Sequence, residues 1–392
     1  MARRWAEGSV ARLPLLELLE LHSQSVPDQL VAAVRELLAG AGLGDARFYL
    51  ADYSQHSLRP LSGGGPPLDI DSTAAGRAYR QMSAHYGDRA RRQLWLPLLD
   101  HGSRLGVLGV RVDPDSGLTE RELQRLADLV TMMLVSARLY SDQTHRTRRA
   151  TPLEMGTELR WDLLPPLSLF TPALCLAGML EPAYEVAGDA FDYAFDDGVA
   201  HFAVLDAVGH GLEASSIVNL VIGAYRNQRR EGADLVALYR YLDDIVVKEF
   251  ASEKFVTAHL GELDITEGRL SWIAAGQPPP LLLRRGRSHD LQGVIVTPVG
   301  MGFTVEPEVT THQLEPQDTL VFFSDGVTEA RSGEGELFGR QALRDLLTRA
   351  AHSHDPATEM VRRLVHAVLD HVGAPLSDDA TVLALQWRPD EL

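Results

Sequence analysis

Four aspartates between residues 189 and 378 share one local setting. Each stands at the end of an apolar run or at a tight glycine turn: Asp189 in AGDAFDY, Asp206 in FAVLDAVGHG, Asp325 in LVFFSDGV and Asp378 in LSDDATVLAL. Converging carboxylates repel one another, by about 4 kcal/mol for two charges about 4 Å apart in a partly desolvated site. A divalent cation relieves that repulsion, and ligand sets made only of oxygen select Mg²⁺ or Mn²⁺.

A plainer interpretation applies to each aspartate taken alone, because aspartate beside glycine is a common turn residue. Four residues in the same setting favour a shared site. Residue types and spacing leave an acidic metal site as a candidate beside that alternative.

The elements that must position these residues begin near Pro152. Strand patterns recur in HFAVLDAV, FVTAHLGEL, RLSWIAAG, PPLLLRRG, DTLVFFSDG and ATVLALQW, with helical patterns at about 213–230, 234–250, 340–350 and 356–372. Strands in pairs and helices in pairs predict an α+β layered sandwich over residues 151–392, not a βαβ alternation.

The N-terminal sequence predicts a helix and a separate domain. Residues 1–24 are predicted to form an amphipathic helix. A signal peptide is not expected, because Glu17 and Glu20 interrupt the apolar stretch and no cleavage site follows. Residues 25–116 combine a helix with strand patterns in ARFYLADY, LWLPLL and RLGVLGVRV and a short helix around 74–83. They predict an α/β domain.

A linker helix is predicted over residues 117–150. Thr119 and Glu122 form a capping box. An apolar stripe then repeats at three- and four-residue steps, and the helix runs into QTHRTRR, a basic segment expected to be solvated. The stripe either packs on its own domain or pairs with a second copy in a coiled coil. We expect a homodimer.

Composition excludes several classes of protein. A net charge of −17 argues against sequence-independent nucleic-acid binding, which needs a basic surface. The chain has no run of 18 apolar residues, so no membrane span is expected. Its one cysteine, Cys175, excludes intrachain disulfides and is expected in the core. These features fit a cytoplasmic protein.

An ordered series of motifs resembles the PPM-type serine/threonine phosphatases of the bacterial SpoIIE/RsbU group. The series covers residues 158 to 388 and consists of ELRWDLLPP, EPAYEVAGDAFDY, LDAVGHGLEAS, FVTAHLGELD, AAGQPPPLLLR, VFFSDGVTEAR, ELFG and DDATVLAL. The resemblance implies an αββα sandwich of the PPM phosphatase type. It also implies a hydrolase that removes phosphate from phosphoserine or phosphothreonine of a partner protein, with an anti-sigma factor antagonist as the usual substrate.

The same resemblance implies the roles of the site residues. Asp206 would bridge two Mn²⁺ or Mg²⁺ ions, and the backbone carbonyl of Ala207 would bind one of them. Asp189 would contribute to one ion, and Asp325 and Asp378 would hold the other. A metal-activated water would then attack phosphorus without a covalent enzyme intermediate, with Asp206 and Asp189 as the catalytic carboxylates.

Neighbouring residues are expected in lesser roles. Asp192 and Asp379 would support the ligands or face water. His210 lies between two glycines in a turn, and Glu329 and His201 are expected to make local contacts.

The chain departs from the family pattern at two positions. Ala187 stands where a glycine is common, and Gln277 stands where many relatives have histidine. Gln277 is therefore a candidate for altered substrate contacts or rate. The sequence assigns no arginine as a phosphate clamp.

Residues 25–116 resemble, more weakly, a GAF-type sensor domain through ARFYLADYSQHSLRPL, GRAY and LWLPLLDHGSRLGVLGVRV. The resemblance implies a small-molecule ligand or a dimerising role. Without a cysteine in this region a thioether-linked bilin is disfavoured, and His22, His56, His85 and His101 are expected at the surface rather than on haem.

Two alternatives remain beside a phosphatase regulated by its N-terminal domain. One is a catalytically weak scaffold that retains the fold, which the presence of all four carboxylates disfavours. The other is a phosphohydrolase acting on small molecules, for which no phosphate-cradling P-loop is present. The regulatory hypothesis is that a signal moves or pairs the linker helix and thereby repositions ELRWDLLPP.

Overall fold

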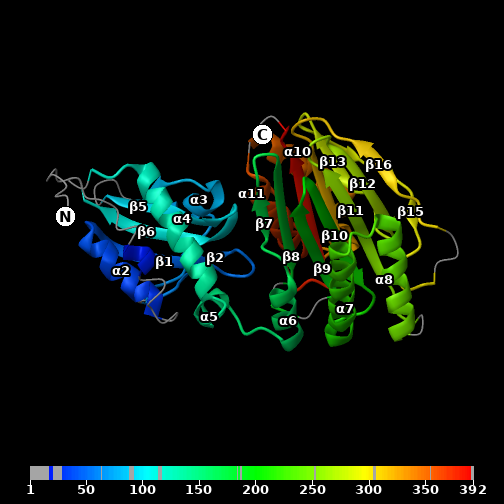
Figure 1. Ribbon diagram of the computed structural model, residues 1–392, viewed down its shortest axis with the longest axis horizontal. Helices are drawn as coiled ribbons and strands as arrows, with labels where there is room; N and C mark the ends of the chain where they lie inside the picture. The colour runs from blue at the N-terminus through cyan, green and yellow to red at the C-terminus, as the bar shows by residue number, and fades with distance from the viewer. Residues whose placement is uncertain are drawn as a thin grey trace, which may run out of the picture. The chain divides into compact units, whose positions relative to one another are not determined.

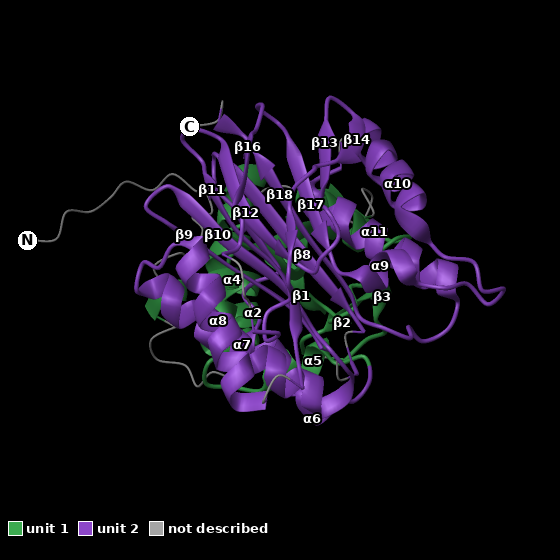
Figure 2. Ribbon diagram, turned by 90° about the vertical axis from the view of Figure 1, so that its right-hand side faces the viewer, with its two compact units in different colours: residues 1–150 green, residues 151–392 purple. Residues whose placement is uncertain are grey.

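The computed structural model describes residues 17–20, 29–62, 64–87, 92–113, 117–182, 184–185, 188–250, 253–302, 306–353 and 355–389. The chain divides into two compact units, residues 1–150 and 151–392 (Figure 2). Of the helix predicted over residues 1–24, residues 17–20 are helical and the remainder lies outside the described residues. Within the described ranges, no helix is long and apolar enough to cross a membrane.

Unit 1 is a six-stranded antiparallel sheet with helices on both faces (Figure 1). The strand order is β3-β2-β1-β6-β5-β4. The elements are α2 (Leu30–Gly40), β1 (Leu43–Ala51), β2 (Ser57–Pro60), β3 (Leu68–Asp69), α3 (Ala74–Gln81), β4 (His85–Tyr86), β5 (Gln93–Asp100), β6 (Ser103–Val112), α4 (Glu120–Ala137) and α5 (Gln143–Arg148). The predicted strands and the short helix around 74–83 are confirmed.

The helices of unit 1 cover the sheet with matched apolar faces. Val34 and Leu38 of α2 and Leu126 of α4 share one core with Phe48 of β1. On the opposite face, Tyr79 of α3 packs in a second core with side chains of the sheet. The sheet is therefore buried on both sides by side chains of its own unit.

Four histidines of this unit were expected at the surface, and three of them lie within the described residues. His56 and His101 are exposed, and His85 is partly buried at the short strand β4. His22 lies outside the described residues. The expected surface positions of His56 and His101 are confirmed.

The linker is two helices, so the prediction of one helix over residues 117–150 is wrong. The capping box of Thr119 and Glu122 is confirmed at the start of α4. The helix ends at Ala137, and α5 begins only at Gln143. Ser141 lies in the break, where its hydroxyl accepts a hydrogen bond from the N–H of Gln143 at 3.3 Å and so competes with helical hydrogen bonding.

The apolar stripe of α4 packs on its own unit. Its members Leu123, Leu126, Val130, Met133 and Leu134 are all buried in the core beneath the sheet. Of the two alternatives for this stripe, the structure therefore shows packing within the unit.

The basic segment after α4 is also not solvated as predicted. Arg148 of α5 donates from Nε to the carbonyl of Ala51 at 3.1 Å and lies 4.4 Å from the ring centroid of Tyr53. Arg59 donates from Nε to the carbonyl of Thr147 at 3.0 Å. These contacts attach α5 to β1 and β2.

Unit 2 is a four-layered αββα sandwich, as predicted (Figure 1). One sheet has the order β15-β12-β11-β10-β9, with β16 also paired to β12, and the other has the order β14-β13-β17-β18-β8-β7. The strands are β7 (Ser168–Phe170), β8 (Leu174–Glu181), β9 (Asp189–Asp196), β10 (Val199–Ala207), β11 (Val256–Asp264), β12 (Arg269–Ala275), β13 (Leu281–Arg284), β14 (Arg287–Asp290), β15 (Ile295–Val296), β16 (Thr310–Gln313), β17 (Thr319–Phe323) and β18 (Ala380–Trp387).

Helices cover the two outer faces of this sandwich. They are α6 (Met155–Leu163), α7 (Gly211–Arg230), α8 (Leu235–Phe250), α9 (Asp325–Glu329), α10 (Gly339–Ser353) and α11 (Ala357–Val372). The cores show that α7 and α8 pack on the β9–β12 sheet and that α10 and α11 pack on the β8–β18 sheet. Cys175 is buried in the second of these cores, as expected.

Alternation along the strands separates the inner layer from the outer ones. In β10, Phe202 and Val204 face the other sheet, whereas Ala203 and Leu205 face the helices. In β18, Leu383 likewise faces inward. The two sheets thus pack on each other through a continuous apolar layer. A residue at a strand end that lies on this inner face points between the sheets.

This inner layer predicts where the sandwich is most sensitive to truncation. The ring of Phe322 lies 4.6 Å from that of Phe202 and 5.0 Å from that of His259, centroid to centroid. We expect Phe322→Ala to destabilise unit 2 by about 3–5 kcal/mol, measured by urea unfolding. The exposed Leu337→Ala is the control and should stay within about 0.5 kcal/mol of the wild type. A loss below about 1 kcal/mol for Phe322→Ala would contradict the described packing.

Candidate metal centre

Two of the predicted ligands lie directly opposite each other on neighbouring strands. Asp189 is the first residue of β9, and Asp206 is the next-to-last residue of β10. In the antiparallel register, Asp206 pairs with Asp189. Asp189 lies on the same face of β9 as Phe191, and Asp206 lies on the same face of β10 as Val204. Both aspartates therefore lie on the inner faces of the sheets, at one end of the sandwich.

The opposing sheet brings the other two ligands to the same end of the sandwich. Asp325 begins α9 one residue after the end of β17, and Asp378 lies just before β18. Ser324 stands between β17 and α9 at the N-cap position, where serine ordinarily caps the helix. Its hydroxyl instead donates to Asp189 Oδ2 at 2.7 Å, which ties the two sheets together at the acidic site.

Asp379 holds the chain just before β9. Its Oδ2 accepts hydrogen bonds from the backbone N–H of Gly188 at 2.5 Å and of Asp189 at 3.2 Å. Asp379 thus fixes the backbone of the predicted ligand Asp189. Asp378 is exposed and accepts from the N–H of Asp379 at 2.9 Å.

Two glycines allow the backbone to approach this closely. A Cβ on Gly188 would lie 2.7 Å from the carbonyl oxygen of Ala207, the predicted backbone ligand. A Cβ on Gly326 would lie 1.9 Å from the carbonyl oxygen of Asp379. Any side chain at either position would displace the backbone that carries the acidic residues. Ala187, the departure from the family pattern next to Gly188, lies outside the described residues.

Burial and mutual repulsion perturb the carboxylates strongly. Burial, followed by the charges of Asp206 and Asp379, raises the pKa of Asp189 well above its usual range. Burial and the charges of Asp325, Asp378 and Asp379 raise the pKa of Asp206 to about 7.

The other sheet shows the same effect. Partial desolvation raises the pKa of Asp325, and the charges of Asp378 and Glu329 add to the shift. Burial raises the pKa of Asp379 to about 6, although the nearby charge of Arg160 opposes the rise. The carboxylates are therefore close enough to oppose one another's ionisation.

The donor set at this end of the sandwich fits a divalent cation. As the side chains stand, no group of three or more Asp, Glu, His or Cys residues is arranged to hold a metal ion in the described part of the chain. The side chains nevertheless offer only oxygen, and the carbonyl of Ala207 adds another oxygen. Their shared repulsion is the kind that a bound cation relieves.

Asp192 is not part of the site and does not face water. It is buried and pairs with Arg226 at 2.6 Å and Arg229 at 2.8 Å, both on α7. Of the two roles expected for Asp192, supporting the ligands or facing water, the structure rules out the second, because the alternation along β9 directs the side chain to the helices. It contributes to the site only by fixing β9.

His210 lies at the turn predicted for it. Gly209 and Gly211 on either side have φ of +100° and +72°, which glycine adopts without strain. His210 is exposed, in the N-cap position of α7, with no capping hydrogen bond from its side chain. His201 pairs with Glu262 at 3.3 Å, as a local contact.

Gln277 connects indirectly to Asp206. It is buried, and its Nε2 donates to Thr257 Oγ1 at 2.7 Å. That hydroxyl in turn donates to Asp206 Oδ2 at 3.3 Å. Gln277 therefore orients a hydroxyl that orients the central carboxylate.

Arg160 is the site residue that the sequence analysis missed. It lies in α6 and is only 1% exposed, and the charges of Asp379, Asp189 and Glu181 act on its guanidinium. A signal was present in the sequence, because Arg160 follows Gly156 at the spacing of one helical turn and therefore shares the face of α6 that is buried.

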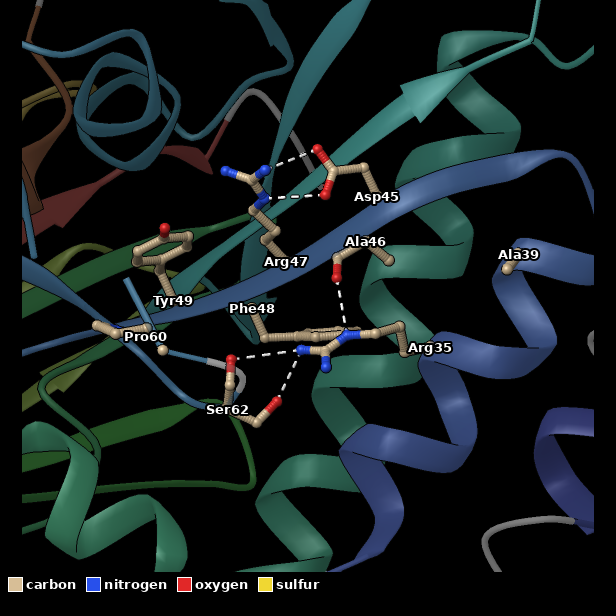
Figure 3. Close-up of a pocket in the computed structure, with 10 residues that line it drawn as sticks. Arg35, Ala39, Asp45, Ala46, Arg47, Phe48, Tyr49, Pro60 and Ser62 are labelled. Atoms are coloured by element: carbon tan, nitrogen blue, oxygen red, sulfur yellow. Dashed lines mark hydrogen bonds and ion pairs between the residues drawn. The ribbon is translucent and has the colours of Figure 1, made fainter. Parts of the chain in front are cut away.

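Unit 1 contains a cavity of about 510 Å³ between α2, β1 and the segment after β2 (Figure 3). Arg35 crosses it, donating from Nε to the carbonyl of Ala46 at 3.0 Å and from Nη2 to Ser62 Oγ at 2.7 Å. Arg47 lines it beside its ion-pair partner Asp45, 2.9 Å away. The cavity presents guanidinium and hydroxyl groups together.

The electrostatics of the acidic site predict an unusual effect of mutation on stability. Because the pKa of Asp206 is raised to about 7, its contribution to the stability of the metal-free protein is greatest at acid pH. That contribution falls above the ordinary aspartate pKa of about 4 and is lost as the pH rises through about 7. We expect Asp206→Asn, which resembles the protonated form, to raise the thermal midpoint of metal-free protein at pH 8 and to raise it less at pH 5.

Mn²⁺ supplies the second half of this test. At pH 8, excess Mn²⁺ should raise the thermal midpoint of the wild type through binding to the folded state and leave that of Asp206→Asn unchanged. A lower midpoint for metal-free Asp206→Asn at pH 8, or an equal response of both proteins to Mn²⁺, would contradict the described site.

Comparisons with known proteins show what this chain is similar to. Residues 196–388 match the family described as Stage II sporulation protein E (SpoIIE). The phosphoserine phosphatase RsbU of Bacillus subtilis (strain 168) is 24% identical over 281 residues, which cover 69% of this chain and 82% of RsbU. Protein IcfG of Synechocystis sp. is 24% identical over 263 residues, which cover 59% of this chain and only 41% of IcfG.

Solved structures show the same fold. The RsbU and RsbW domains of Rv1364c from Mycobacterium tuberculosis are 28% identical with a TM-score of 0.51, covering 57% of this chain and 62% of that chain. The SiaA-PP2C domain of Pseudomonas aeruginosa is 20% identical with a TM-score of 0.50, covering 59% of this chain and 94% of that one. Residues 196–388 thus match the SpoIIE family, and unit 2 has the fold of the PP2C phosphatase domains.

Proposed function

We propose that the chain is a Mn²⁺- or Mg²⁺-dependent protein phosphatase that hydrolyses phosphoserine or phosphothreonine on a partner protein. The observation that carries the proposal is the convergence of carboxylates from both sheets at one end of the sandwich. Asp189 and Asp206 face each other across β9 and β10, and Ser324 from the other sheet bonds to Asp189.

Five groups would hold the two metal ions that the family leads us to expect: the carboxylates of Asp189, Asp206, Asp325 and Asp378 and the carbonyl of Ala207. Bound there, Mn²⁺ or Mg²⁺ would supply an activated water near neutral pH and offset the negative charge of the phosphoryl group. Asp206 is the central residue, because its charge acts on Asp189 of its own sheet and the charges of Asp325 and Asp378 from the other sheet act on it.

The remaining residues of the site fix these ligands. Ser324 and Asp379 hold Asp189 and its backbone, and Thr257 orients Asp206. The exposed carboxylates of Asp325 and Asp378 leave one side of the site open to a phosphorylated side chain of another protein.

The similarity to RsbU, which is named a phosphoserine phosphatase, supports a phosphoprotein substrate. Within that class we propose a phosphorylated anti-sigma factor antagonist. The structure that pairs an RsbU domain with an RsbW domain is a further reason to place the chain in this regulatory chemistry. A catalytically weak scaffold is the alternative.

Phosphatase activity is tested with an aryl phosphate. We expect Mn²⁺-dependent hydrolysis by the wild type and a fall in kcat/KM of at least about 1000-fold in Asp206→Asn, because the shared carboxylate is lost. Asp264→Asn is the matched control. Asp264 ends the neighbouring strand β11, where it accepts from the N–H of Thr266 at 2.9 Å, and its loss should leave kcat/KM near that of the wild type. Absence of wild-type activity, with tight binding of a phosphorylated partner, would support the scaffold instead.

Substrate class requires a separate comparison. A phosphorylated antagonist protein, a phosphoserine peptide and a nucleotide would be offered at equal concentration with Mn²⁺. We expect the phosphoprotein to have the highest kcat/KM. Preference for the nucleotide would contradict a protein phosphatase.

For unit 1 we propose a GAF-like sensor role. The cavity crossed by Arg35 is the candidate site for a small ligand with acceptor groups (Figure 3). Helix α5 is attached to β1 and β2 through Arg148 and Arg59, and only residues 149–154 separate it in sequence from α6 of the phosphatase domain. Movement of α5 would therefore be passed along the chain to α6. We also propose that the chain acts as a homodimer in the cytoplasm.

Removal of residues 1–145 tests this regulatory proposal. We expect the truncated protein to differ from the full chain at least about threefold in kcat or in the Kd for Mn²⁺, because α6 is no longer linked to an intact α5. Isothermal calorimetry and phosphate release measure the two quantities. Unchanged activity together with unchanged metal affinity would refute the coupling.

A further inference from the structure

Arg160 is a buried cation whose charge acts on the acidic site. It projects from α6 and is 1% exposed, so it is covered from solvent. Its Nη2 donates to the carbonyl of Pro182 at 2.7 Å and to that of Glu185 at 3.3 Å. Its Nε and Nη1 have no hydrogen-bond partner within the described part of the chain. Burying an incompletely paired guanidinium is costly, so the position calls for an explanation.

The two carbonyls that Arg160 binds lie just before the first predicted ligand. The described residues of this segment lead from the end of β8 to Gly188 and Asp189. Nearer to β9, the chain is held by Asp379, which accepts from the N–H of Gly188 and of Asp189. Arg160 therefore holds Pro182 and Glu185, and Asp379 holds Gly188 and Asp189.

The charges around Arg160 match this arrangement. The negative groups that act on it are Asp379, Asp189 and Glu181. Its guanidinium thus attracts the carboxylates at the base of the site. Because the side chain is covered, it is not placed to contact a phosphoryl group of a protein substrate.

Helix α6 has two more attachments to the same region. The N–H of Glu154, at its N-cap, donates to the carbonyl of Tyr184 at 3.2 Å. At the other end, the carbonyl of Leu163 accepts a hydrogen bond from Arg226, which also pairs with Asp192 of β9. Among these attachments, Arg160 is the one whose own charge acts directly on the carboxylates of the acidic site.

We propose that Arg160 is a positioning residue of the metal centre: by holding the carbonyls of Pro182 and Glu185 it fixes Asp189 and Asp379, so that its contacts set the affinity for the metal. This inference rests on the proposed function, since it requires the acidic site to bind a metal ion. It makes Arg160 the residue through which a displacement of α6 reaches the ligands.

Calorimetric titration of the full chain with Mn²⁺ tests the proposal. We expect Arg160→Ala to raise the Kd for Mn²⁺ at least about tenfold, as loss of a residue that orients ligands commonly does. Arg160→Lys should recover only part of the affinity, because one ammonium group cannot reproduce a planar fork across two carbonyls. At saturating Mn²⁺, the KM for an aryl phosphate should stay near the wild-type value.

If Arg160 acted only through its charge, its removal would change the affinity for Mn²⁺ in the opposite direction. The experiment therefore distinguishes the two roles. A cation that only repels the incoming ion would give tighter Mn²⁺ binding when removed. Equal or tighter binding by Arg160→Ala would therefore overturn the proposal, as would a raised KM with unchanged metal affinity. If Arg160→Ala does not fold, Arg160→Lys carries the same comparison, and wild-type affinity in that variant overturns the positioning role.

Arg362 provides a matched control. It is equally buried, and its Nε donates to Glu359 at 3.0 Å within α11. Arg362→Ala should lower the thermal midpoint and leave the Kd for Mn²⁺ unchanged. Failure of the proposed function would give a different result from failure of the role of Arg160. If the proposed function is wrong, the wild type itself binds no Mn²⁺ in the titration.

Discussion

Repulsion among carboxylates is the constraint on which the phosphatase domain depends. The fold places Asp189, Asp206, Asp325, Asp378 and Asp379 at one end of the sandwich, where burial and like charge raise the pKa of Asp206 to about 7. A protein selected only for stability would not collect these groups in one place. The rest of the domain supplies the rigidity that keeps them there.

That rigidity comes from both sheets and from α6. The inner apolar layer fixes the sheets against each other. At the site, Ser324 joins the two sheets, because its hydroxyl donates a hydrogen bond to Asp189 and does not cap α9. Gly188 and Gly326 remove the side chains that would separate the backbones. Arg160 binds the carbonyl of Pro182 after β8, and Asp379 binds the N–H of Gly188 before β9.

The sequence allowed much of this arrangement to be predicted, for identifiable reasons. Strand alternation and helical periodicity predicted a layered sandwich and the helices α7, α8, α10 and α11, because a face that packs must be apolar. The aspartates were recognisable from their places beside glycines and strand ends. The break between α4 and α5 was not predicted, since the apolar period of α4 leads into residues 138–142 without a proline or glycine to mark its end. The buried pairing of Asp192 and the position of Arg160 depend on contacts with distant segments, which local patterns do not encode.

The most direct measurement is anomalous scattering at the manganese edge from crystals of the protein grown with Mn²⁺. The account predicts two anomalous peaks that share the carboxylate of Asp206, one of them beside Asp189 and the other beside Asp325 and Asp378. The absence of these peaks from crystals of Asp206→Asn would agree with that assignment. Manganese bound elsewhere, with these carboxylates left without an ion, would contradict it.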